Sequence, residues 1–109
     1  METLLVFTNM PDAASAQALA TSLVEKRLAA CVNILAPCRS IYRWQGKIEG
    51  AEEVPLLVKT TTERYAALEQ AIRAQHPYEL PEIVAVPVSR GLPAYLDWVA
   101  EETRGNPEN

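Results

Sequence analysis

Helical spacing of apolar residues marks three stretches of the chain. In the first, residues 13–27, the apolar positions follow the i, i+3, i+4, i+7, i+8 repeat of one helix face: Ala16, Leu19, Ala20, Leu23 and Val24. Asn9 or Asp12 can cap this helix, and Pro11 can lie at its start. The pattern therefore predicts a first helix that follows directly on a short strand.

Two further helices are predicted in the second half of the chain. The first of these, of about 13 residues, follows Thr60 and Glu63, which have the spacing of a capping box, and should end before Pro77. The residues expected on its buried face are Tyr65, Leu68 and Ile72. The other begins after Gly91, and the residues it is expected to bury are Leu92, Tyr95, Leu96 and Val99.

Strand-forming residues fill the segments between these helices. The predicted strands comprise residues 3–8, 29–35, 40–44, 47–49, 54–58 and 82–88. Residues 29–35 are apolar at nearly every position, which predicts a central strand that is covered on both faces. Gln45-Gly46-Lys47 predicts a hairpin turn. Pro55 cannot donate to a strand ladder, so a bulge or an edge position is expected there.

These elements follow the order β-α-β-β-α-β, with an extra C-terminal helix. The order is typical of an α+β, ferredoxin-like split βαβ sandwich, in which helices cover one face of an antiparallel sheet. The opposite sheet face then needs another cover, and sister subunits are the simplest one. We therefore expect a closed oligomer.

The hairpin supports the same expectation. Fully extended, residues 28–44 would span about 50 Å, whereas a domain of this length has a diameter of about 34 Å. The ribbon must bend, overhang or pair elsewhere. An overhanging ribbon with Tyr42 and Trp44 near its tip invites pairing with a neighbouring subunit, so functional sites are expected between subunits.

Size and charge narrow the class of protein. A chain of 109 residues is expected to form one domain, residues 1–109, with a flexible tail at 104–109. The formal net charge is -4 and basic residues do not cluster, which argues against nucleic acid and anionic membranes as partners and favours cations. The chain has neither a signal-peptide pattern nor about 20 consecutive apolar residues, so a soluble, cytoplasmic protein is expected.

The residues that could carry chemistry are few. No G-x-S-x-G, H-E-x-x-H, C-x-x-C or glycine-rich phosphate loop occurs, so we expect no enzyme. The loop 76–82 places the only histidine, His76, near Glu79 and Glu82, between two prolines. This loop could bind a metal ion such as copper(II) or zinc, with further ligands from elsewhere. Alternatively, a protonated His76 only complements the end of a helix, and the glutamates are solvated.

The two cysteines are expected to remain reduced, because seven residues of extended strand would hold their Cα atoms too far apart for a disulfide. Cys31 lies in the most apolar strand and is interpreted as a small core residue. Cys38 follows the bend expected at Pro37 and lies beside Arg39, which makes it the candidate reactive thiol. The alternative is an ordinary exposed loop cysteine.

Aromatic and basic residues near the hairpin turn form a second candidate site. Tyr42, Arg43 and Trp44 could bind a small anion, or could serve oligomer packing instead. Lys59, at the end of an apolar strand, could act as an anion clamp or could simply be solvated. Together with Tyr78 and Glu79, these residues are the candidates for a ligand-binding cleft.

Five segments of the chain, in the same order, resemble the CutA family of divalent-cation tolerance proteins: residues 24–34, 40–47, 57–60, 76–83 and 91–98. The resemblance runs from about Leu4 to Glu101. It implies a homotrimer of ferredoxin-like subunits, similar to the PII signalling trimers, with long hairpins that embrace neighbouring subunits. It also implies a cytoplasmic protein that is linked to tolerance of copper and other divalent ions and has no established catalytic activity.

The resemblance also implies a metal site. In some family members copper(II) is thought to be bound at the positions of Thr8, His76 and Glu82, with a cysteine at the first of these. Thr8 cannot supply a thiolate, and its hydroxyl is a poor ligand for copper. The local hairpin geometry is also expected to differ from the family pattern, because residues 36–39 and Pro55 depart from it.

Two functional hypotheses follow. The first is a non-enzymatic trimer in metal homeostasis that requires no cofactor and binds copper(II) or another divalent cation weakly, at His76 and Glu82 near subunit clefts. The second is a PII-like signalling or scaffold trimer that binds a small anion between subunits, through Lys59, Arg43 and nearby aromatic residues, and acts on an unknown protein partner.

Overall fold

The structure is a computed structural model that describes residues 2–105. Its elements are β1 (Thr3–Met10), α1 (Ala13–Glu25), β2 (Cys31–Ile34), β3 (Cys38–Trp44), β4 (Lys47–Thr61), α2 (Tyr65–Gln75), β5 (Val84–Pro87) and α3 (Pro93–Glu102). The predicted order is confirmed, except that the long second strand is divided into β2 and β3. Asp12 caps α1 as expected, since its carboxylate accepts a hydrogen bond from the Ser15 amide at 2.8 Å.

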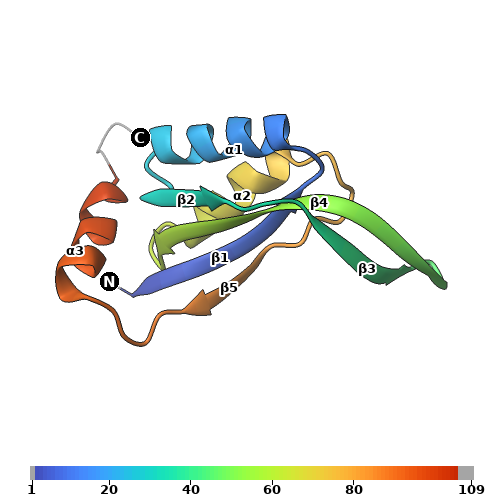
Figure 1. The fold of residues 1–109 in the computed structure, drawn as a ribbon. Helices are drawn as coiled ribbons and strands as arrows, with labels where there is room; N and C mark the ends of the chain where they lie inside the picture. Colours follow the sequence, from blue (N-terminus) through green and yellow to red (C-terminus); the bar gives the residue numbers. More distant parts are fainter. Residues whose placement is uncertain (1, 106–109) are drawn as a thin grey trace.

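The sheet is antiparallel, with the strand order β2-β4-β1-β5, and β3 pairs with the far half of β4. Helices α1 and α2 cover one face of it, whereas α3 packs across the end of the sheet (Figure 1). This is the predicted ferredoxin-like α+β sandwich with an added helix. The core lies between the sheet and the two covering helices.

Alternation along β1 and β4 decides which side chains enter this core. Leu4, Val6 and Met10 of β1 are buried under the helices, as are the even-numbered residues of β4 from Val54 to Thr60. Each fully buried aliphatic side chain contributes about 1.5–3 kcal/mol to folding. A strand that kept this pattern but slipped by one residue would expose the whole set to solvent.

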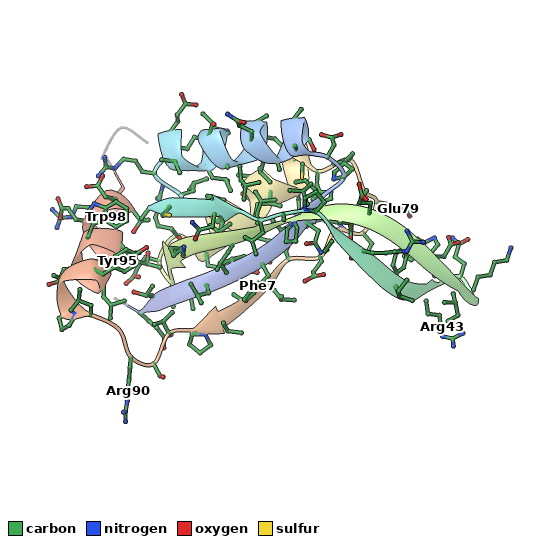
Figure 2. All side chains as sticks on the ribbon, in the orientation of Figure 1. Phe7, Arg43, Glu79, Arg90, Tyr95 and Trp98 are labelled. Atoms are coloured by element: carbon green, nitrogen blue, oxygen red, sulfur yellow. The ribbon has the colours of Figure 1, made fainter. Side chains whose placement is uncertain are left out.

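The opposite side of the sheet, which we call the open face, has no helix over it. Its apolar residues come from neighbouring strands: Leu5, Phe7, Leu57, Val84 and Val86. Phe7 extends from the sheet on the side away from α1 and is 38% exposed (Figure 2). The sequence-based expectation of one uncovered sheet face is therefore met.

Strands β3 and β4 continue past the rest of the sheet as a two-stranded ribbon (Figure 1). The ribbon ends in a two-residue turn in which Gln45 and Gly46 both have positive φ, 49° and 81°. It lengthens the molecule to 44 Å along its longest axis, against 31 and 23 Å along the others. The predicted overhang is confirmed, and residues 35–37 provide the break between β2 and β3.

Three predictions about strands and caps were wrong. Strand β2 is an edge strand with partly exposed residues and not a central one. Within residues 29–35, Ala29 and Ala30 are buried, whereas Ile34 and Leu35 are exposed. Thr60 does not cap α2; it lies in β4 and its hydroxyl donates to the Leu28 carbonyl at 2.7 Å. Helix α2 has 11 residues and no side-chain cap.

Pro55 causes no bulge, because β1 and β4 stay in register through it. Its carbonyl accepts a hydrogen bond from the Leu35 amide, so its nitrogen faces the same side, where the chain leaves the sheet between β2 and β3. The central strand β4 therefore accommodates a proline, because Pro55 lies beside the gap between β2 and β3, where no strand needs its missing N–H group.

Burial of two helix faces was also overestimated. Val24, at the end of α1, is 43% exposed. In α3, Val99 is buried, whereas Leu92 is 71% exposed and Tyr95 and Leu96 are only partly covered. The cause is the position of α3 at the end of the sheet, where one turn of the helix contacts the core and the rest extends beyond it.

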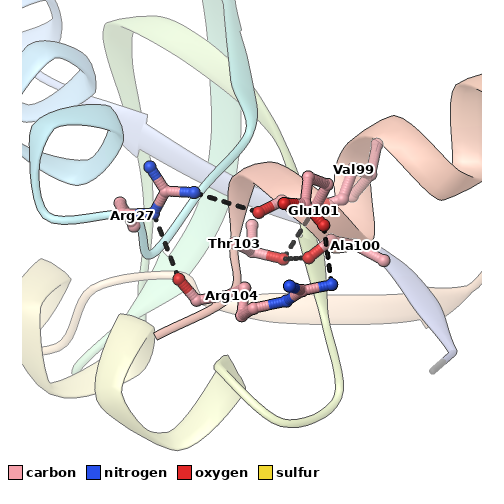
Figure 3. Close-up of polar contacts among 6 residues, drawn as sticks. All are labelled: Arg27, Val99, Ala100, Glu101, Thr103 and Arg104. Atoms are coloured by element: carbon pink, nitrogen blue, oxygen red, sulfur yellow. Dashed lines mark hydrogen bonds and ion pairs between the residues drawn. The ribbon is translucent and has the colours of Figure 1, made fainter. Parts of the chain in front are cut away.

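Arg27 connects the end of α1 to the end of α3 (Figure 3). Its Nε donates to the Arg104 carbonyl at 3.1 Å, and its terminal nitrogen donates to the Glu101 carbonyl at 3.0 Å. We call these two contacts the Arg27 latch. They hold Arg104, the first residue of the predicted flexible tail, whereas residues 106–109 of that tail lie outside the described part of the chain.

Candidate functional site

A groove of about 830 Å³ lies where the ribbon leaves the sheet. One wall is the ribbon, which carries Arg43, and the other is the loop that carries Glu79 (Figure 2). Its lining residues are Asn9, Ser40, Ile41, Tyr42, Arg43, Trp44, Glu49, Ala51, Glu53, Tyr78, Glu79, Leu80 and Glu82. The groove thus combines segments that are far apart in the sequence.

Strand register places two glutamates of the ribbon in this groove. Glu49 lies directly opposite Tyr42, and Glu53 lies opposite Cys38. Glu53 is only 9% exposed. Burial, followed by the charge of the Glu53 carboxylate, raises the pKa of the Tyr78 hydroxyl. The Tyr78 hydroxyl therefore stays protonated at neutral pH.

His76 and Glu82 are brought together by Asn9. The Asn9 carbonyl accepts a hydrogen bond from Nε2 of His76 at 2.6 Å, and the Asn9 side-chain amide donates to Glu82 at 3.2 Å. Nδ1 of His76 accepts a hydrogen bond from the Tyr78 amide at 3.2 Å. Both ring nitrogens of this 8% exposed side chain are therefore engaged.

These contacts fix the tautomer of His76. A main-chain amide can only donate, so Nδ1 carries no proton and Nε2 is the protonated nitrogen. The suggestion that a protonated His76 complements the end of α2 is wrong, although its main chain does cap that helix through the Ile72 carbonyl. A metal ion could bind this ring only by displacing one of its two hydrogen bonds.

The groove is acidic. Four glutamates line it, Glu49, Glu53, Glu79 and Glu82, against the single cation Arg43. Carboxylate oxygens in this number favour a bound cation and disfavour an anion. Hard divalent ions prefer such oxygen ligands, whereas copper(II) also seeks imidazole nitrogen.

Most of the predicted cleft residues line this groove: Tyr42, Arg43, Trp44, Tyr78 and Glu79. Glu82, predicted as a metal ligand, lines it as well. Lys59 does not, because its ammonium donates to the side chain of Asn33 on the open face. Cys38 is exposed and its sulfur lies 3.9 Å from the Ser40 hydroxyl, outside the groove lining. The anion cleft that was expected to unite Lys59 with Arg43 is therefore not formed within one chain.

The other two notable positions lie elsewhere as well. The Thr8 side chain is buried under the helices, without a hydrogen-bond partner among the described residues. Cys31 is not a core residue as interpreted: it is partly exposed, and it lies on the open face directly opposite Lys59. Within residues 2–105, no three histidine, cysteine or acidic side chains are close enough to hold one metal ion together.

The groove residues that sequence reasoning missed include Asn9, Glu49 and Glu53. The signal for the two glutamates was available: a two-residue turn at Gln45-Gly46 fixes the hairpin register, and period-two alternation then places them on the face of Tyr42. Asn9 had been considered only as a helix cap. Its role depends on the return of the loop 76–82 to β1, which no local pattern predicts.

Comparison with known proteins identifies the family. Residues 4–102 match the family described as CutA1 divalent ion tolerance protein. The chain belongs to the CutA1 family. It is 48% identical over 99 residues to the divalent-cation tolerance protein CutA of Thermus thermophilus, which covers 91% of this chain and 96% of that protein.

Two further relatives agree with this assignment. The protein CutA of Mus musculus is 45% identical over 97 residues, which cover 89% of this chain and 55% of that longer protein. The crystal structure of CutA from Xylella fastidiosa superposes with a TM-score of 0.92 at 46% identity, over 95% of this chain and all of that one. The fold of this CutA1 protein is thus shared along nearly its whole length. None of the helices among its described residues has the length and apolar character needed to cross a membrane.

Proposed function

We propose that this CutA1 protein acts in divalent-cation tolerance by binding cations weakly in the acidic groove, and that it has a binding role rather than a catalytic one. The observation that supports this most is the groove itself, in which Glu82 and three other glutamates surround the aromatic residues of the ribbon. Membership in a family named for divalent ion tolerance agrees with a cation as the cargo.

Weak binding follows from the contacts of the groove. Glu82 already accepts a hydrogen bond from the side-chain amide of Asn9. His76 would have to release the Tyr78 amide or the Asn9 carbonyl before it could bind an ion. Each lost hydrogen bond to a buried group costs about 1–3 kcal/mol, which reduces the net affinity.

The proposed role separates ions by their preferred ligands. Manganese(II), which prefers oxygen, should bind through Glu82 and its neighbours and should be insensitive to His76→Ala. Copper(II) and zinc should also use His76, so the same substitution should weaken them. We expect Glu82→Gln to weaken all three ions about tenfold, which corresponds to about 1.4 kcal/mol.

Isothermal titration calorimetry with each ion tests this proposal. Glu25→Gln is the matched control, because Glu25 lies at the end of α1, outside the groove, and its substitution removes the same charge from the protein. Equal effects of the two glutamine variants would reduce the role of the groove to net charge and would refute the proposal.

We also propose that three copies of the chain assemble through the open face, with each ribbon reaching a neighbour. The uncovered apolar residues and the unpaired edges of the ribbon support this assembly. Light scattering should then give three times the chain mass of 12.0 kDa. Phe7→Glu should reduce that mass, whereas Val24→Glu, at a similarly exposed site on α1, should not. A monomeric wild-type protein at micromolar concentration would contradict the assembly.

A cytoplasmic location belongs to the same proposal. Both cysteines are free, and their partners on β4, Lys59 and Glu53, are six residues apart, or about 20 Å along the strand. The chain therefore gains nothing from an oxidising compartment. Fractionation of cells that express the tagged protein would test this location.

A further inference from the structure

Aromatic side chains give the acidic groove a property that a metal ion does not need. Tyr42, Trp44 and Tyr78 line it, and all three are partly exposed. Its volume of about 830 Å³ is within the range of small-molecule binding sites. The face of an aromatic ring attracts organic cations as well as apolar groups. The lining therefore favours a ligand that has both positive charge and an apolar body.

The carboxylates of the groove are spread along it and do not converge on one point. Glu49 and Glu53 are four residues apart on β4, which separates their Cα atoms by about 13 Å. Glu79 and Glu82 belong to the loop 76–82. Within residues 2–105, no three histidine, cysteine or acidic side chains lie close enough to hold one metal ion together. Separate positive charges along one flexible ligand match this arrangement better than a single ion does.

Glu53 points most clearly to a cationic ligand. It is 9% exposed and it lines the groove. In the part of the chain that the structure describes, no basic side chain forms an ion pair with it, and the one ion pair found joins Arg104 to Glu101. The neighbouring Tyr78 hydroxyl is neutral, because burial and this carboxylate raise its pKa, so it cannot balance the charge. An ionised carboxylate that is buried this far is costly unless a cation pairs with it.

We propose that the acidic groove binds a linear aliphatic polyamine, with the ammonium groups on the glutamates and the methylene chain on the aromatic rings. Four carboxylates against the single guanidinium of Arg43 leave three net negative charges, which a triamine such as spermidine neutralises when it is fully protonated. Polyamine binding rests on the proposed function, since both place cations in the same groove. It differs in the class of cation, which is organic and extended.

The groove lies outside the surface that the proposed assembly covers. The open-face residues, among them Phe7 and Leu57, do not line it. Alternation along β4 also gives the ribbon two faces. Ile48, on the face opposite to Glu49, is 64% exposed and is not part of the lining. A neighbouring chain can therefore contact the ribbon through Ile48 while the groove stays open to a ligand.

Titration of the assembled protein with spermidine, at physiological ionic strength, tests the site by calorimetry and by tryptophan fluorescence. Trp98→Phe leaves Trp44 as the only tryptophan, so its emission then reports on the groove, and we expect it to change in a saturable manner. Two ligand controls each lack one property of spermidine. Hexaamminecobalt(III) has the same charge but no apolar chain, and monoacetylated spermidine keeps the chain but has one charge fewer. Both should bind about tenfold more weakly in calorimetry.

Substitutions then assign the binding to the groove. Glu53→Gln should weaken spermidine binding about tenfold, the loss expected for one charge-assisted contact. Because Glu53 is buried, Glu49→Gln and Trp44→Leu provide variants at more exposed positions, and each should weaken binding several-fold in calorimetry. Glu25→Gln removes the same charge outside the groove and should leave the affinity unchanged. Circular dichroism of each variant reports whether the protein remains folded.

Several results would overturn polyamine binding. They are a wild-type protein that shows no saturable response to spermidine, an equal affinity for either ligand control, and an effect of Glu25→Gln as large as that of the groove variants. Binding only by a dissociated Phe7→Glu protein would also overturn it, since neighbouring chains would then close the groove. Failure of the proposed function is a different outcome: manganese(II) and copper(II) would not bind, whereas spermidine still would. Metal binding without spermidine binding would refute the polyamine alone.

Discussion

Arg27 occupies a position that normally favours glycine, and this makes it a sensitive test of how the helices are held. Helix α1 ends in a Schellman motif: the Leu28 amide donates to the Leu23 carbonyl and the Arg27 amide donates to the Val24 carbonyl. The residue after the C-cap must adopt a left-handed conformation, and Arg27 does so with φ of 58°. Its side chain provides the latch to the end of α3.

The magnitudes of the two effects can be set against each other. Hydrogen bonds from a charged donor contribute about 1.5–3 kcal/mol when buried, and for the half-buried Arg27 we take about 1 kcal/mol for each of its two contacts. The left-handed backbone costs a non-glycine residue about 1–2 kcal/mol. Glycine avoids this strain, and the greater entropy of its unfolded state cancels only part of that gain. Arg27→Ala should therefore cost about 2 kcal/mol, and Arg27→Gly about 1 kcal/mol.

Urea denaturation at one fixed protein concentration measures both variants. A loss of 1 kcal/mol should also lower the melting temperature by about 4 °C for a chain of this size. Arg104→Ala is the control: it removes the exposed ion pair with Glu101 but keeps the Arg104 carbonyl that Arg27 contacts. Its expected cost is below about 0.5 kcal/mol.

Two outcomes would refute this reasoning. If Arg27→Ala were as stable as the Arg104→Ala control, the latch would contribute nothing. If Arg27→Gly were no more stable than Arg27→Ala, the left-handed backbone would not be strained. Hydrogen exchange of the α3 amides adds a local check, since loss of the latch should increase their exchange more than that of amides in β1.

The remaining predictions concern single positions. The Ser15 amide lowers the pKa of Asp12, so the charged cap stabilises the protein above pH 3.8, and this stabilisation is lost as the pH falls through the lower pKa of the folded state. Asparagine also caps helices but does not titrate, so Asp12→Asn should make stability less dependent on pH in acid unfolding followed by circular dichroism. Identical acid-unfolding profiles of the two proteins would contradict this. At the ribbon turn, Gln45→Asn should raise the free energy of unfolding, because asparagine favours positive φ at this position. Gly46→Ala should lower it by about 1 kcal/mol. A more stable Gly46→Ala variant than Gln45→Asn variant would exclude this turn type. Thr8→Val replaces a buried hydroxyl that has no described partner, so it should leave stability unchanged or raise it by about 1 kcal/mol, and a clear loss would reveal a partner.

Much of the fold could be predicted because local patterns and the global sheet agree. The apolar spacing of Leu19 and Leu23 defines α1, and Gln45-Gly46 defines the hairpin turn. The overhang followed from a comparison of strand length with domain size. Where predictions were wrong, tertiary placement had overridden a correct local pattern: Leu92 is apolar at helical spacing, yet α3 extends beyond the core.

The site was harder to predict for a related reason. Tyr42, Trp44 and Glu82 could be named as candidates because aromatic and charged residues are unusual near a turn and in a proline-bounded loop. Their true neighbours Glu53 and Asn9 lie on strands and look like ordinary strand residues. Lys59 lies outside the groove of the single chain, and a sequence does not show how far along β4 that groove extends.

Strand β4 explains how one chain separates its opposite charges. On the odd-numbered face of this strand, Glu49 and Glu53 lie in the overhang, apolar Leu57 lies in the middle, and Lys59 lies near the end. The even-numbered residues in the second half of the strand face the helices, so the hydrophobic core fixes which side every charge occupies. The acidic groove and the apolar open face are thus consequences of one register. A change that shifted β4 by one residue should disrupt the groove and the open face together, whereas Glu82→Gln should weaken the proposed cation binding alone and Phe7→Glu should reduce the proposed assembly alone.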